Sequence, residues 1–180
     1  DDNYLLLEKD LIARSGDVKT ENDFHNTTFE NKLSAGDYGT GDVLYFGDST
    51  SLTLGQLYFL SSSHPTSHLG SGSWSTADAD DLSLERLLGI SLGTSAQNDG
   101  MLICGFVRIP AAQVKNVKAN GANTGLPLYL SPTAGHVEFD MPSGSDEVVR
   151  VVGHCIDDHS GDILMYFNPD ASGSMVGRED

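Results

Sequence analysis

Basic residues are scarce in this chain. Among its 180 residues, 10 are lysine or arginine and 26 are aspartate or glutamate, so the formal net charge is −16. A protein that neutralises phosphates needs clustered Lys and Arg side chains, and an acidic surface repels the polyanion. An anionic membrane surface is disfavoured for the same reason. The composition therefore argues against nucleic acid and membranes as partners.

Cysteines and long apolar runs are also few. Cys104 and Cys155 could form at most one disulfide, which is too little for a disulfide framework. No apolar stretch approaches the roughly 20 residues that a membrane-spanning helix requires. The sequence starts with neither Met nor a basic-then-apolar leader. We therefore expect Asp1 to be a processed end or the start of a domain cut from a longer protein.

Helix-forming Glu is rare beside turn-forming residues: the chain has 7 Glu against 19 Asp, 20 Ser and 20 Gly. Short apolar runs alternate with these turn residues, which predicts an all-β fold, an antiparallel β-sandwich or barrel. Only residues 111–119 resemble a short helix. The expected strands cover residues 42–46, 56–60, 85–92, 100–109, 126–130, 136–139, 147–156 and 162–167.

The first forty residues differ from the rest. After apolar clusters at residues 4–7 and 11–13, residues 16–41 are mostly polar. Such a segment buries too little apolar surface to offset the entropy of ordering its own core. Residues 1–40 are therefore expected to be an extended arm along a neighbouring surface or a flexible linker.

The strand pattern occurs twice, which predicts two related β-modules at residues 41–115 and 116–180. Each copy has a first strand, a strand with a central glycine, a closing strand and a final proline. The matching segments are 55–61 and 125–131, 88–92 and 152–156, 99–103 and 160–164, and Pro110 and Pro169. A glycine inside an apolar strand indicates a bulge or a close backbone approach.

The second copy carries a resemblance. Residues 125–135 (GLPLYLSPTAG), the turn at 142–144, residues 148–153 (VVRVVG) and residues 163–170 (ILMYFNPD) are similar to a β-rich module of tailed-bacteriophage virion proteins. Related modules close fibre-like and capsid-associated proteins in phages of marine cyanobacteria and other aquatic bacteria. Residues 74–80 and 100–107 of the first copy resemble the module that often precedes it. The polar residues 171–180 depart from that pattern, in which an aromatic residue often follows.

The resemblance implies a virion structural protein, a capsid-associated decoration or fibre subunit that acts by packing and without catalysis. Other virion proteins, such as those of the capsid or tail, would be its partners. A tail-fibre receptor-recognition domain that binds glycans is the alternative. Incomplete β-units bury their open faces against symmetry mates, so we also expect a homo-oligomer, with a trimer as the expected form.

Candidate metal ligands are sparse. His64 and His68 lie in a Ser/Gly-rich loop with no third ligand indicated, so loop histidines explain them better than zinc. The cluster from His154 to His159 alternates between the faces of a strand and then enters a turn. Asp78, Asp80 and Asp81 could hold calcium, although they lack the pattern of an EF-hand and also fit a solvated turn. No cofactor or metal is expected.

No catalytic motif stands out. No serine lies in a Gly-x-Ser-x-Gly elbow, no phosphate-binding loop follows a strand, and Cys104 lies among apolar strand residues that predict an inert buried thiol. We therefore expect no enzyme.

The one tryptophan, Trp74, follows the loop of residues 61–73. An exposed ring there would favour glycan binding, with His64 and His68 as further receptor contacts. The alternative is that the ring closes the end of the β-domain.

Overall fold

The computed structural model describes residues 39–47, 49, 51–61, 72–80, 86–119, 122–158, 162–171 and 174–175. Their regular structure is twelve strands and one short 3-10 helix, so the all-β prediction is confirmed. Most of the predicted arm, His64, His68, Asp81 and His159 lie outside this described part. Within it, no helix has the length and apolar character needed to cross a membrane.

Nine of the twelve strands overlap the predicted apolar runs, and the strands at residues 73–76, 114–115 and 174–175 were not predicted. The twelve strands are β1 (Gly39–Leu44), β2 (Leu57–Ser61), β3 (Ser73–Thr76), β4 (Leu88–Ser91), β5 (Met101–Ile109), β6 (Val114–Lys115), β7 (Pro127–Leu130), β8 (Val137–Glu138), β9 (Val148–Val149), β10 (Val151–Asp157), β11 (Ile163–Phe167) and β12 (Ser174–Met175). The helix predicted over residues 111–119 is wrong. Only Ala111–Gln113 forms a 3-10 turn, because Val114 is extended and buries its side chain in the core.

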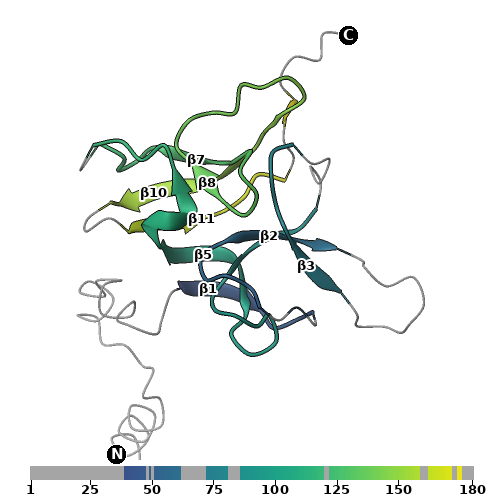
Figure 1. Ribbon diagram of the computed structural model, residues 1–180. Helices are drawn as coiled ribbons and strands as arrows, with labels where there is room; N and C mark the ends of the chain where they lie inside the picture. Colours follow the sequence, from purple (N-terminus) through teal and green to yellow (C-terminus); the bar gives the residue numbers. More distant parts are fainter. Residues whose placement is uncertain are drawn as a thin grey trace, which may run out of the picture. The chain divides into compact units, whose positions relative to one another are not determined.

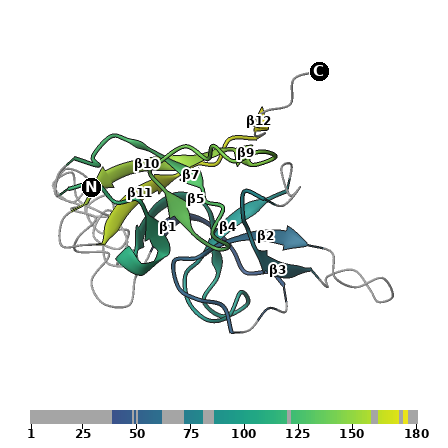
Figure 2. The same ribbon diagram turned by 45° about the horizontal axis from the view of Figure 1, so that its top comes forward.

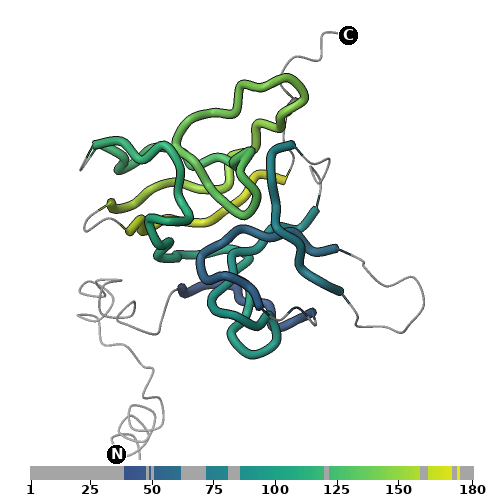
Figure 3. The backbone as a smooth tube through the Cα atoms, in the orientation of Figure 1, coloured from purple at the N-terminus to yellow at the C-terminus, as the bar shows by residue number. Residues whose placement is uncertain are grey.

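Ten strands form one curled, mixed sheet (Figures 1 and 2). Along the sheet the order is β3-β2-β4-β5-β11-β10-β7-β8-β6, with β1 beside β5. The strand pairs are antiparallel, as predicted, except for the parallel pair of β6 and β8. Strands β9 and β12 form a separate two-stranded sheet. Native strand twist and the bulges in several pairs curl such a sheet around its core, as the backbone trace shows (Figure 3).

Strand β5 is the longest strand, with nine residues, and it lies between β4 and β11 in the middle of the sheet. Its first two residues, Met101 and Leu102, pair with β1 on one edge and with β4 on the other. Residues 105–107 again pair with β1, and here β11 takes the second edge. Strands β4 and β11 therefore share one edge of β5, and β1 covers the opposite edge.

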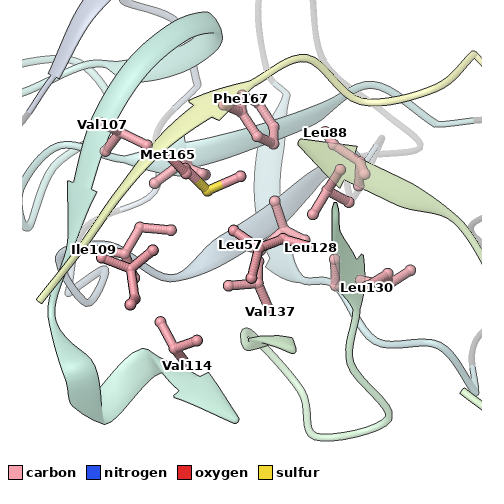
Figure 4. Close-up of a cluster of buried hydrophobic side chains, with 14 of the residues drawn as sticks. Leu57, Leu88, Val107, Ile109, Val114, Leu128, Leu130, Val137, Met165 and Phe167 are labelled. Carbon is pink, nitrogen blue, oxygen red and sulfur yellow. The ribbon is translucent and has the colours of Figure 1, made fainter. Parts of the chain in front are cut away.

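A continuous apolar core fills the inside of the curled sheet (Figure 4). It draws on both predicted modules, and residues 37–180 form one compact unit. The labelled core residues are Leu57, Leu88, Val107, Ile109, Val114, Leu128, Leu130, Val137, Met165 and Phe167. A second, smaller cluster surrounds Trp74 and includes Tyr58 and Met101.

The segment after β3 ties the two halves of the sheet together. Ala77 donates its N–H to the Leu57 carbonyl at 3.0 Å and accepts from the Gly135 N–H at 2.7 Å. Ala79 accepts from the Val148 N–H at 2.8 Å. Both alanine side chains are fully buried. Backbone from both halves of the sheet therefore converges on these two positions.

The first strand of each predicted repeat, β2 in one and β7 in the other, is preceded by a glycine with the same backbone geometry. Gly55 and Gly125 have φ angles of 75° and 81°. The Gly55 N–H donates to the Ser91 carbonyl at 2.9 Å, and the Gly125 N–H donates to the Cys155 carbonyl at 2.8 Å. The closing strands differ, since β5 has nine residues and β11 has five.

A buried carboxyl lies on the short strand β8. Glu138 is 7% exposed, and the Ser131 hydroxyl donates to its Oε2 at 3.1 Å. Burial raises the pKa of Glu138, and the nearby Glu147 and Asp140 raise it further, while the Ser131 hydrogen bond lowers it. Because the folded-state pKa lies above the unfolded value, the ionised carboxylate opposes folding as the pH rises through the folded pKa.

The E138Q variant is therefore expected to raise the melting temperature at pH 7. This gain should shrink toward zero near pH 4 and below, where Glu is largely protonated in both states. Thermal melts followed by circular dichroism at both pH values measure the difference. The exposed Asp146, which is not among the groups that shift the pKa of Glu138, supplies the control, D146N, which should show no such pH-dependent gain. A lower melting temperature of E138Q at pH 7 would contradict the expectation.

Candidate functional site

The candidate site is the face of β1, β5, β11 and β10 that points away from the core, here named the outer face. Val107, Ile109, Met165 and Phe167 point into the core. Neighbouring residues on a strand point the opposite way, and directly paired residues share a face. The outer face therefore carries the side chains of Thr40, Asp42, Cys104, Phe106, Arg108, His154, Asp157, Leu164 and Tyr166.

A row of four side chains crosses the outer face at right angles to the strands. Thr40 pairs with Phe106, Phe106 with Tyr166, and Tyr166 with His154. The Phe106 and Tyr166 rings contact each other, with centroids 4.9 Å apart and planes tilted by 47°. His154 is exposed, and the other three are half-buried. The row thus has an aromatic pair at its centre.

Cys104 lies beside this aromatic pair. Its Sγ is 3.9 Å from the Tyr166 hydroxyl and 3.8 Å from Asn168 Oδ1. The hydrogen bond with Cys104, followed by the charges of Cys104 and Asp42, raises the pKa of Tyr166, so its hydroxyl remains a donor at neutral pH. The predicted burial of Cys104 is wrong. The pairing of β1 and β5 shifts register between Asp42 and Val43, and this bulge turns Cys104 onto the outer face.

The two thiols should therefore react differently. Cys155 is fully buried, and burial raises its pKa to about 11, whereas Cys104 is partly exposed. A disulfide-exchange reagent at pH 8 is expected to titrate one thiol per native chain and the second only in denaturant. The C104S variant should lose the fast reaction. Two fast thiols in the native protein, or none, would contradict this assignment.

Among the described residues, the outer face carries two acids, Asp42 and Asp157, and one base, Arg108; Asp157 pairs with Leu164, which pairs with Arg108. Asp42 lies level with Cys104 on one side of the row, and Arg108 lies two residues from Phe106 on the other side. Among the described residues, neither forms an ion pair within its own chain. This arrangement can pack against a flat, largely uncharged surface or stack against planar groups.

Trp74 is buried rather than exposed. Its side chain is 6% exposed, and its indole Nε1 donates to the Phe46 carbonyl at 2.8 Å. Ser49 Oγ accepts from the Trp74 N–H at 2.7 Å. The ring therefore has no free face for a sugar, which removes the basis on which Trp74 was predicted as a receptor contact. His64 and His68, its predicted partners, lie outside the described residues.

The predicted acidic and histidine clusters do not converge. Among the described residues, no three His, Cys, Asp or Glu side chains are placed to hold a metal ion. Asp78 Oδ1 accepts from the Asp80 N–H at 2.8 Å, the pattern of a local turn. His154 is exposed on the outer face while Cys155 points into the core. Asn123 Nδ2 donates to Asp158 Oδ2 at 2.6 Å, which fixes a neighbouring loop.

Sequence reasoning missed the outer face as a site. The signal was present in the alternation of Cys104, Phe106 and Arg108, a partly polar series within an apolar run. The run as a whole predicts a buried strand, so Cys104 and its neighbours were predicted to be buried with the rest of the run. Comparisons with protein-family models, curated proteins and solved structures found no match for the chain.

Proposed function

We propose that this chain is a structural protein of a tailed-phage virion, a capsid-associated decoration or fibre subunit that acts by assembly and packing without catalysis. The observation that carries the proposal is the outer face. It combines an aromatic pair with two acids and one base among its described residues, on a chain whose net charge is −16. A face of mixed aromatic and polar side chains suits contact with another protein. The sequence resemblance to virion modules supplies the setting.

The proposed architecture is a sandwich or barrel of two related β-modules, residues 41–115 and 116–180, preceded by an arm. The matching turns at Gly55 and Gly125 and their matching hydrogen bonds support this relationship. The shared core indicates that neither module would be stable alone. In the virion the protein would form a homo-oligomer, a trimer, because the open half-curled sheet leaves a face that symmetry mates can cover.

A sedimentation experiment tests the assembly role. The tagged chain is mixed either with DNA-free capsids of a tailed phage of marine cyanobacteria or with cells of that phage's host, and bound protein is quantified after centrifugation. Saturable binding to capsids is expected, with little binding to cells. No binding to capsids would overturn the decoration role.

Receptor recognition is the second candidate, because the half-buried Tyr166 ring of the outer face could stack on a sugar ring. Binding to cells that free host polysaccharide competes away, with no binding to capsids, would favour it. In that case Y166A should reduce cell binding, while D140N, on a distant exposed residue, should not.

A further inference from the structure

The backbone of Ala79 joins three segments that are far apart in the sequence, a contact here named the Ala79 junction. The Ala79 N–H donates to the Ser131 carbonyl at 3.0 Å, and the Ala79 carbonyl accepts from the Val148 N–H at 2.8 Å. Ser131 directly follows β7, and Val148 begins β9. All three residues are buried. A change at this junction therefore alters how the segment after β3 is held against the second half of the sheet.

A buried carboxyl group reaches the junction through Ser131. The Ser131 hydroxyl donates to Glu138 Oε2 at 3.1 Å, while the carbonyl of the same serine accepts from Ala79. Because Glu138 is buried, its ionised form loses hydration that one hydroxyl donor does not replace. The protonated form of Glu138 therefore suits the closed junction better than the ionised form.

A second carboxyl group lies at the other end of the junction. Glu147 directly precedes Val148, and its Oε2 accepts from the Gly144 N–H at 2.6 Å. Burial raises the pKa of both Glu138 and Asp80, the residue after Ala79, and the charge of Glu147 raises both further. Glu147 is thus close enough to repel carboxylates on both of the segments that meet Val148 and Ser131 at the junction.

Opposite charges near Glu138 do not cancel this repulsion. Lys115 pairs with Glu138 across β6 and β8, and Tyr129 pairs with it across β7 and β8. The nearby Asp140 adds to the negative charge and has its own partner, since its Oδ1 lies 3.7 Å from Lys118 Nζ. Among the described residues, no lysine or arginine forms an ion pair with Glu138. Ionisation of Glu138 therefore adds a charge that the folded chain opposes.

We infer that the Ala79 junction is a pH-sensitive lock, closed most tightly when Glu138 is protonated and loosened when Glu138 and Glu147 are both ionised. The folded-state pKa of Glu138 is raised, so the stabilisation is complete at acid pH and is lost as the pH rises through that pKa. Loosening is local: the hydrogen bonds at Ala79 open while β5, in the middle of the sheet, stays paired. The lock goes beyond the proposed function and does not depend on it.

Amide hydrogen exchange followed by mass spectrometry, between pH 7 and pH 5 and corrected for intrinsic exchange rates, tests the lock. In the wild type at pH 7, residues 77–80 and 147–149 should be less protected than β5, and acidification should raise their protection about threefold or more. E138Q should show the higher protection already at pH 7 and no further rise, and E147Q should show a smaller rise. D146N, at an exposed neighbouring acid, should behave like the wild type.

The readings decide for or against the lock. Low protection at the junction that rises on acidification in the wild type and D146N but not in E138Q supports it. Junction protection that is independent of pH, or a rise that E138Q retains in full, would overturn it. Protection at pH 7 equal to that of β5 would also overturn it, because the junction would then open only with the whole fold. Circular dichroism identifies any misfolded variant, and the wild-type series then decides alone.

Discussion

The G105A variant is expected to lose about 3 kcal/mol or more of its free energy of unfolding. Gly105 has a φ of 141° and lies opposite Gly41, whose φ is 148°. A Cβ atom at Gly105 would overlap the Thr40 carbonyl oxygen and lie 2.7 Å from the Gly41 Cα. The two strands can approach this closely only because neither residue has a side chain. Urea unfolding followed by circular dichroism measures the loss.

A matched glycine separates steric overlap from backbone strain. Gly125 also has a positive φ, of 81°, but a Cβ there would meet no atom within 4 Å. The G125A variant should therefore cost only about 1–2 kcal/mol, the price of the left-handed backbone. If G105A were no more destabilising than G125A, the close approach of β1 and β5 would not exist in solution.

The W74A variant is expected to lose about 4 kcal/mol of stability, the typical cost of removing a large buried aromatic ring. Trp74 fills the second apolar cluster between Tyr58 and Met101. Its removal leaves a cavity and also leaves the Phe46 carbonyl without its indole donor. The measurement is again urea unfolding, with the slope against denaturant compared to that of the wild type.

The W74F variant is the companion to W74A, because it keeps most of the ring but not the N–H. Its loss should be smaller, since phenylalanine fills part of the cavity. Trp74 fluorescence in the wild-type protein should show blue-shifted emission and weak quenching by acrylamide. Red-shifted, readily quenched emission together with a near-neutral W74A would show that the ring is exposed after all.

The strands could be predicted from the sequence because each depends on a local pattern. The run at residues 100–109 became β5, and residues 162–167 became β11, since short apolar runs between turn residues have few other stable conformations. The helix expected after Pro110 failed for a non-local reason: burial of Val114 against the core outweighs a weak helical preference. The single parallel pair of β6 and β8 also depends on contacts distant in sequence.

The outer face could not be predicted because it exists only after pairing. Thr40, Phe106, Tyr166 and His154 become neighbours through three separate strand pairs. A bulge between Leu102, which lies in the core, and Cys104 reverses the alternation there, so Cys104 shares the outer face with Phe106. Trp74 is similar, since its burial depends on a carbonyl 28 residues earlier in the chain. The position of Trp74 after a loop is compatible with both an exposed and a buried ring.

The shared edge of β5 bears on the order of folding. Strands β4 and β5 are close in sequence and can pair early, but the second half of the same edge must wait for β11, more than fifty residues later. Until β11 is synthesised and docked, Val107 and Ile109 lack the strand that completes their side of the core. Pairings of such long sequence separation are slow to form and expose apolar strand edges meanwhile. Slow folding, with transient association of chains through β5, is the consequence for a nascent copy of this protein.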